Sequence, residues 1–232
     1  MEAGGLPPRE ADVAPAPVRP DPTAGASAGF WRPADPGPLG LAGFAATTFV
    51  LSMMNSNLVS DQGIGVVLAL AIAYGGIAQL LAGMWEFRTG NTFGAVAFSS
   101  YGAFWISFFF LLHLTARDGL TPHAVSLYLW AWGIFTTYMF FASLRTTGAI
   151  ALVFLLLSIT FILLAIGDMG GGHKSITHAG GYVGIATAAA AWYASFAAVI
   201  NSTFARVVLP VFPLRAVYEA EPSETRQTAC PR

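Results

Sequence analysis

Six long runs of apolar residues, joined by short polar stretches, organise the middle of the chain. Each run has close to the ~20 residues that a helix needs to cross the hydrocarbon core of a bilayer. The runs are continuous, whereas strands of a membrane β-barrel would be about half as long and would alternate in polarity. The pattern therefore predicts an all-α membrane protein, a bundle of six transmembrane helices. The runs cover Leu39–Ser56, Ile64–Trp85, Phe93–Leu114, Ala124–Leu144, Thr147–Gly167 and Ile176–Ile200.

The two ends of the chain differ from this middle. Residues 1–36 are rich in Pro, Ala and Gly and contain few bulky apolar side chains, so they cannot bury enough surface to offset the entropy of ordering. They also lack the apolar run of a signal peptide. We expect a disordered N-terminal tail over residues 1–36, a six-helix transmembrane domain over residues 37–210 and a flexible C-terminal tail over residues 211–232.

Charge is scarce, and this excludes several classes of function. Only 10% of the 232 residues are charged and the net charge is −1, whereas an average soluble domain has roughly 25% charged residues. A nucleic-acid partner is excluded because such proteins cluster Lys and Arg on one face. The single cysteine, Cys230, allows neither an internal disulfide nor a cysteine metal site.

The placement of basic residues predicts the orientation in the membrane. Cytoplasmic loops carry an excess of Lys and Arg. Among the basic residues near helix ends, with the N-terminus inside, five arginines face the cytoplasm and only Arg117 and Lys174 face outward. We therefore expect a multi-pass protein of the plasma or inner membrane with both termini in the cytoplasm. The five are Arg32, Arg88, Arg145, Arg206 and Arg215.

No set of residues typical of an enzyme is present. The four histidines form no metal-binding spacing with carboxylates, so we expect no metal and no cofactor. The helix midpoints contain hydroxyls and amides but no Lys, Arg or Asp, which argues against a pump with a buried ion-pair relay. Glu86, at the inner end of the second run, and His178, at the start of the sixth, are candidates for a role in a pathway or in proton transfer.

Small residues recur at helical spacing. Gly180 and Gly184 are four apart on the sixth run, and Gly75, Gly76 and Gly83 lie on the second. Small residues let membrane helices approach closely. The pattern predicts close helix packing within the protomer or at a subunit interface.

The start of the first run holds two prolines and two glycines between Asp35 and Leu41. Exposed N–H groups at a helix N-terminus bind carboxylates, and proline is tolerated in the first turn. From the residues alone, the segment is either an anion-binding helix start or ordinary helix punctuation.

This segment resembles the Asn-Pro-Ala-Pro-Leu-Gly-Leu signature of the acetate/succinate transporter family, also called the GPR1/FUN34/YaaH group. The signature positions are Asp35, Pro36, Pro38, Leu39, Gly40 and Leu41. The likeness continues over about residues 35–210. It includes Tyr74–Gln79, Gly90–Gly94, Ser100–Trp105, Leu164–Gly167, His178 with Gly181, and Phe204–Pro210.

The resemblance implies a six-helix protomer in a hexameric ring, with a separate pathway through each protomer for acetate, related short carboxylates and, in some members, succinate. It implies that Phe44, Tyr101 and Leu157 narrow the pathway. The hydroxyls of Thr47 and Thr48 lie nearby, and Asn55 and Gln79 are further candidates for binding the substrate. The sequence departs from the family pattern at Asp35, Ala142 and Ala179 and in its long N-terminal tail.

The resulting hypothesis is passage of acetate, alone or with a proton, through an apolar constriction. Moving a bare carboxylate through a low dielectric costs up to tens of kcal/mol, and protonation lowers this cost. A urea or amide channel of similar hexameric architecture is the alternative transport function, and a membrane scaffold with partner-binding tails is an alternative of another class.

Overall fold

The computed structural model describes residue 31 and residues 33–115, 121–169 and 173–214, and within them the regular secondary structure is helical apart from one isolated β-bridge. The predicted disordered tail over residues 1–36 lies largely outside the described residues, as do residues 215–232 of the predicted C-terminal tail. The elements are α1 (Gly37–Asn55), η1 (Asp61–Gly63), α2 (Ile64–Ile72), η2 (Ala73–Ala78), α3 (Gln79–Thr89), α4 (Thr92–Thr115), α5 (Pro122–Ser143), α6 (Gly148–Gly167) and α7 (Lys174–Thr203).

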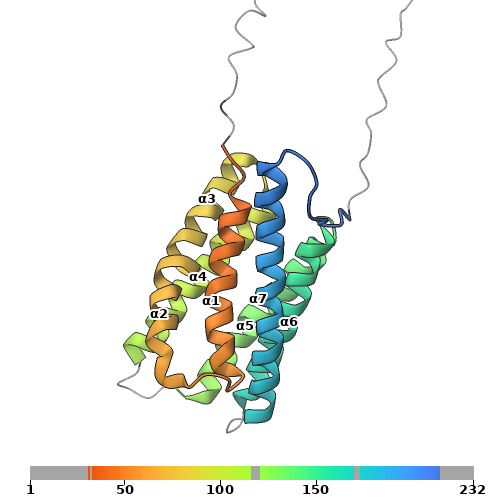
Figure 1. Ribbon diagram of the computed structural model, residues 1–232. Helices are drawn as coiled ribbons and strands as arrows, with labels where there is room; N and C mark the ends of the chain where they lie inside the picture. Colours follow the sequence, from red (N-terminus) through yellow and green to blue (C-terminus); the bar gives the residue numbers. More distant parts are fainter. Residues whose placement is uncertain (1–30, 32, 116–120, 170–172, 215–232) are drawn as a thin grey trace, which may run out of the picture. The chain divides into compact units, whose positions relative to one another are not determined.

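These elements form six membrane-capable spans in the described part of the chain, which confirms the predicted fold class. The second span runs over Asp61–Thr89, and α2, η2 and α3 make up most of it. Figure 1 shows that α1 begins and α7 ends at the same end of the bundle, where α4 and α6 also begin. We call this the terminal end, and we call the opposite end the distal end.

The middle of the second span is a π-helix, η2. Its glycines allow α1 to pack directly on its backbone. A Cβ built on Gly43 of α1 would lie 2.5 Å from the carbonyl oxygen of Tyr74, and one built on Gly75 would clash with the Thr47 hydroxyl. The predicted role of small residues in close helix packing is thus confirmed within the protomer.

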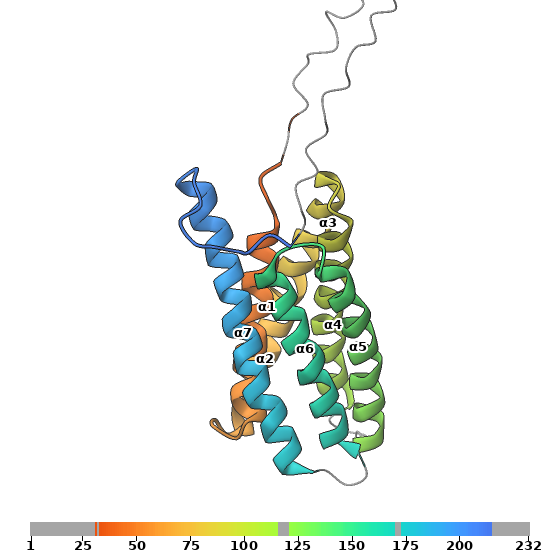
Figure 2. The ribbon, with the colours of Figure 1, turned by 90° about the vertical axis from the view of Figure 1, so that its right-hand side faces the viewer.

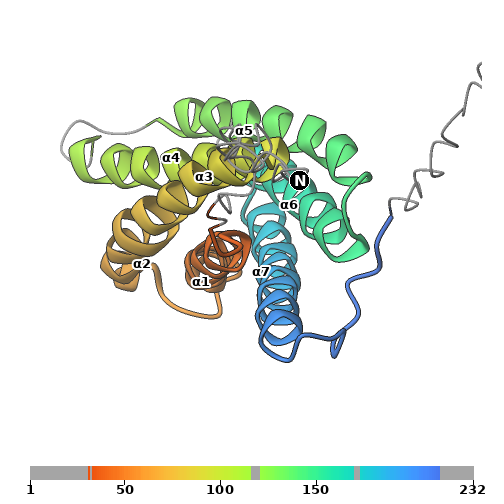
Figure 3. The same cartoon turned by 90° about the horizontal axis from the view of Figure 1, so that it is seen from above.

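Helix α7 lies between α1 and α6, as seen along the bundle axis in Figure 3. The close approach again depends on glycine. Gly184 lies against the Ser52 side chain of α1, and Gly181 lies against the backbone of Asn55 and Ser56. The outer faces of the bundle stay apolar, since Leu127, Ile134 and Phe141 recur every seven residues on α5 and are exposed. Such an apolar surface is the one that lipid or another protomer covers.

After α7 the chain turns back as an extended segment over residues 206–214, which we call the strap (Figure 2). The Asn201 side chain binds the strap through both its oxygen and its nitrogen. Its Oδ1 accepts from the N–H groups of Val208 at 2.7 Å and Leu209 at 2.9 Å, and its Nδ2 donates to the Leu209 carbonyl at 2.8 Å. The strap then caps α6, because the N–H groups of Gly148 and Ala149 donate to the carbonyls of Phe212 and Val211. Residues 211–214, placed in the C-terminal tail by the sequence, therefore have defined hydrogen bonds.

Candidate functional site

Two pockets lie in line inside the bundle. The distal pocket has a volume of about 180 Å³ and the terminal pocket about 350 Å³. Each is lined mainly by α1, α4 and α6, with contributions from other elements. Neither is lined by a Lys, Arg or His among the residues that the structure describes.

The two linings are separated by three residues on α1 and on α6, and by six residues on α4, from Phe98 to Phe104. On α1 the lining passes from Leu41 to Phe44, and on α6 it passes from Phe154 to Leu157. Three residues of helix rise about 4.5 Å. The barrier between the pockets therefore extends over about 4.5 Å along α1 and α6 and about 9 Å along α4.

The barrier is aromatic and apolar. Phe44 and Leu157 are each 4% exposed, and Tyr101 is 3% exposed. The Tyr101 ring contacts both flanking aromatic rings, with centroids 5.7 Å from Phe44 and 6.1 Å from Phe154. Four side chains from three helices thus close the space between the pockets, and Phe154 is a member that the sequence analysis missed. Its position one turn before Leu157 on the same helix is the signal that would have found it.

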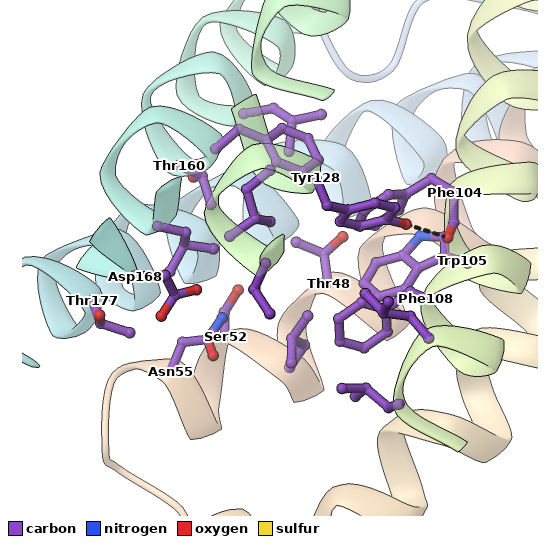
Figure 4. Close-up of a pocket in the computed structure, with 18 of the residues that line it drawn as sticks. Thr48, Ser52, Asn55, Phe104, Trp105, Phe108, Tyr128, Thr160, Asp168 and Thr177 are labelled. Atoms are coloured by element: carbon purple, nitrogen blue, oxygen red, sulfur yellow. Dashed lines mark hydrogen bonds between the residues drawn. The ribbon is translucent and has the colours of Figure 1, made fainter. Parts of the chain in front are cut away.

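The distal pocket combines an apolar wall with a few polar groups (Figure 4). Asp168, Asn55 and Thr177 lie toward one end of it, Phe104, Trp105 and Tyr128 lie toward the other, and Thr48 lies between them. Tyr128 is held in place because its hydroxyl donates to the Phe104 carbonyl at 3.1 Å.

Thr48 is the polar residue of this pocket that is best placed to bind a solute. It is 5% exposed, and its hydroxyl has no hydrogen-bond partner among the described residues. A buried hydroxyl without a partner costs free energy unless a ligand or water pairs with it. Its neighbour Thr47 differs, because the Thr47 hydroxyl donates to the Gly43 carbonyl at 2.9 Å and lines neither pocket.

Asp168 adds an ionisable group at the distal end. It follows the last residue of α6 and lines the distal pocket. Partial burial raises the pKa of its carboxyl above the ordinary value. The sequence analysis did not single out Asp168, because no spacing pattern marks it as a pocket residue.

The terminal pocket is bordered by three helix N-termini. Gly37 and Pro38 begin α1, Phe93 and Gly94 begin α4, and Ala149 and Ile150 lie in the first turn of α6. Two carboxylates, Asp35 and Glu86, line the same space. Asp35 accepts from the Gly37 N–H at 2.8 Å, so it caps the start of α1, and the Thr89 hydroxyl donates to Glu86 at 3.0 Å.

Comparison with known proteins identifies the family to which this architecture belongs. The model of the GPR1/FUN34/YaaH family matches residues 26–216. The chain belongs to the GPR1/FUN34/YaaH family. It is 42% identical over 213 residues to "Acetate permease A" of Emericella nidulans, covering 84% of this chain and 72% of that protein. It is 43% identical over 182 residues to "Succinate-acetate/proton symporter SatP" of Escherichia coli, covering 77% of this chain and 95% of that protein.

A solved structure agrees with these relatives. "Structure of the bacterial acetate channel SatP" matches with a TM-score of 0.74 at 40% identity, covering 77% of this chain and 99% of that chain. The resemblance inferred from the sequence motifs is thereby confirmed. Family members and relatives are transporters or channels, so the protein is not an enzyme, and it is a multi-pass membrane protein.

Within this family architecture, the structure brings some of the predicted site residues together and leaves others apart. Phe44 and Leu157 line the distal pocket with Thr48 and Asn55, and Tyr101 packs against Phe44. Other predicted residues line neither pocket: Thr47, Gln79 and His178. Gln79 is fully buried in the bundle, and its Oε1 has no partner among the described residues.

The signature segment lies at the mouth of the terminal pocket. Asp35, Pro38 and Leu41 line that pocket together with Glu86. Gly40 serves packing, because a Cβ there would come within 2.6 Å of the Phe98 ring. The segment thus starts a helix and faces a cavity, and anion binding by this helix start stays a prediction.

Proposed function

We propose that the protein carries acetate and related short-chain carboxylates across the membrane through a pathway formed by the two pockets. The observation that carries this proposal is the succession of the two pockets along α1, α4 and α6 across an aromatic barrier one to two helical turns thick. The relatives named for acetate or succinate transport support the same substrate class. The urea or amide channel considered from the sequence is not favoured by any of these relatives.

In this proposal Phe44, Tyr101 and Leu157, joined by Phe154, form the constriction that excludes water and larger solutes. Thr48 and Asn55 bind the carboxylate on the distal side. Thr47 and Gln79 remain candidates for substrate binding on the basis of their positions in the sequence motifs alone. Glu86 is the candidate for proton transfer on the terminal side, and His178 stays a weaker candidate because it lines neither pocket.

We also propose that a proton accompanies the passenger. The described lining of the pockets offers no cationic side chain to compensate a carboxylate, and it includes the carboxylates of Asp35, Glu86 and Asp168. Crossing the barrier as a bare anion would cost up to tens of kcal/mol in a low dielectric, whereas the neutral acid avoids most of this cost. Acetate uptake should therefore rise as the pH on the entry side falls.

The orientation and assembly form part of the same proposal. In it the terminal end and both termini are cytoplasmic, and the position of Arg88, Arg145 and Arg206 at the terminal end supports this through the positive-inside rule. Exposed aromatic side chains on α7, including Tyr182 and Phe196, supply an apolar face for a neighbouring protomer of a homohexamer. Transport is assigned to the transmembrane domain over residues 37–210, with Val211 of the strap completing the wall of the terminal pocket.

The experiment is uptake of labelled acetate into proteoliposomes at several external pH values. The unmodified protein should give uptake above that of empty liposomes and more uptake at lower pH. The double variant Phe44→Ala with Leu157→Ala should admit bulkier monocarboxylates that the unmodified protein excludes. Unchanged acetate uptake and unchanged size selection in this variant would refute the assigned constriction, and absence of uptake by the unmodified protein would refute the function.

A further inference from the structure

The terminal pocket contains two carboxylates that lie close to each other. A Cβ built on Gly37 would lie 3.0 Å from Oδ1 of Asp35 and 3.4 Å from Oε1 of Glu86, so these two oxygens are at most about 6.4 Å apart. Glu86 is 2% exposed, whereas Asp35 lies at the open mouth of the pocket. Asp35 is therefore the more accessible of the two carboxylates to a solute that enters from the terminal end.

The backbone holds the charge of Asp35 at this mouth. Its Oδ1 accepts the hydrogen bond from the Gly37 N–H at the first residue of α1. Because of this hydrogen bond, the carboxylate stays at a nearly constant position relative to the entrance, whereas a long side chain on an open surface moves freely. Asp35 is therefore a fixed negative charge at the entrance.

The surroundings of this charge are otherwise favourable to anions. The N-termini of α1, α4 and α6 border the pocket, and each carries a partial positive charge. The entrance thus attracts carboxylates through its backbone and repels them through Asp35 and Glu86. The balance between these two effects depends on how many charges the solute carries.

We propose that Asp35 sets the preference of the terminal pocket for singly charged over doubly charged carboxylates. This inference rests on the proposed function, because it names the specificity of the same pathway. The interaction energy of a solute with a fixed charge is proportional to the charge of the solute. At about 6 Å in a water-like dielectric, one fixed charge lowers the local concentration of a monoanion about threefold and that of a dianion about tenfold.

The test uses Asp35→Asn, which removes the charge and keeps an Oδ1 acceptor for the Gly37 N–H. In inside-out membrane vesicles the terminal end faces the medium, so initial uptake rates report entry through this mouth. Labelled acetate and succinate are compared at pH 7.5, where both are ionised, at low ionic strength and with the membrane potential clamped. Succinate is also measured as an inhibitor of acetate uptake.

The ratio of succinate to acetate uptake should rise about threefold in Asp35→Asn, and this gain should shrink in high salt because the mouth is open to solvent. The matched control is Asp61→Asn, since Asp61 is an exposed residue at the distal end that lines neither pocket. This control should leave the ratio unchanged. Asp35→Ser, which also keeps a capping oxygen without the charge, replaces Asp35→Asn if that variant fails to fold.

The two rates also separate two ways of entry that both support the proposal. Entry as anions raises acetate uptake about threefold and succinate uptake about tenfold, whereas entry of each solute with one proton leaves acetate unchanged and raises succinate about threefold. An unchanged ratio with intact acetate uptake overturns the role of Asp35. Absence of acetate uptake by the unmodified protein refutes the proposed function instead.

Discussion

The hydroxyl of Tyr101 lies 2.9 Å from Oγ1 of Thr136, and Thr136 in turn donates to the carbonyl of Trp132 at 2.7 Å. Because the only hydroxyl proton of Thr136 goes to that carbonyl, Tyr101 is the donor in the first bond. The phenol proton of the barrier residue is thus directed toward α5 and away from the passing solute. Tyr101 acts in the barrier through its ring.

Tyr101→Phe should therefore retain acetate uptake within about twofold and lower the free energy of unfolding by about 1 kcal/mol through the lost hydrogen bond. The measurements are proteoliposome uptake and thermal unfolding in detergent. The companion variant Tyr101→Ala removes the ring and should widen size selection. A tenfold loss of uptake in Tyr101→Phe would show instead that the hydroxyl contacts the passenger.

Thr48 and Thr47 form a matched pair for testing the distal binding site. Thr48→Val should weaken the apparent affinity for acetate about tenfold, because a hydrogen bond to a charged group contributes about 1.5–3 kcal/mol. Thr47→Val has the same change of shape but removes only a bond to the helix backbone, and it should leave the affinity unchanged. Saturation curves of uptake measure both, and equal effects in the two variants would contradict the assignment.

Gly43 and Gly65 form a second matched pair, which tests the packing of α1 on η2. A Cβ on Gly43 would lie 2.5 Å from the Tyr74 carbonyl oxygen, whereas one on Gly65 would meet no atom within 4 Å. Gly43→Ala should lower the free energy of unfolding by about 1–3 kcal/mol, the usual cost of overpacking. Gly65→Ala should be neutral or slightly stabilising, since alanine favours helix. Apparent unfolding temperatures in detergent that are equal for the two variants would disprove this account of the α1 contact with η2.

Asp168 should make the stability of the protein depend on pH. The pKa of Asp168 is higher in the folded than in the unfolded state. Between the ordinary carboxyl pKa of 3.8 and the raised folded-state pKa, the folded state therefore binds more protons than the unfolded state. Stability from this group is fully present below the ordinary value and is lost as the pH rises through the folded pKa. Asp168→Asn removes the dependence, so the stability of this variant relative to the unmodified protein should increase across this pH range. Unfolding temperatures measured from pH 3.5 to 7.5 test this, and a constant difference would contradict it.

The spans and their order could be predicted because continuous apolar runs have few other stable arrangements in a membrane. The barrier residues Phe44, Tyr101 and Leu157 came from motif resemblance, and their spacing alone would not have brought them together. The different environments of Thr47 and Thr48 could not be predicted, because one step along a helix turns a side chain by about 100° and only the neighbouring helices decide which hydroxyl meets a cavity.

The strap was beyond sequence reasoning for a different reason. It has no periodic pattern, and it is held by hydrogen bonds from the side chains of Asn201 and Tyr193 and from the first turn of α6. Such bonds depend on the backbone of a distant segment and leave no signal in composition. The π-helix η2 is similar, since Gly75 and Gly76 indicated close packing but not a change in the helical hydrogen bonds.

The strap also has a consequence for biosynthesis. Val211 forms part of the wall of the terminal pocket, and the carbonyls of Val211 and Phe212 pair the first amides of α6. These residues leave the ribosome after all six spans have been made. The wall of the terminal pocket is therefore completed last, and a chain that stops before residue 211 inserts its helices without this part of the wall.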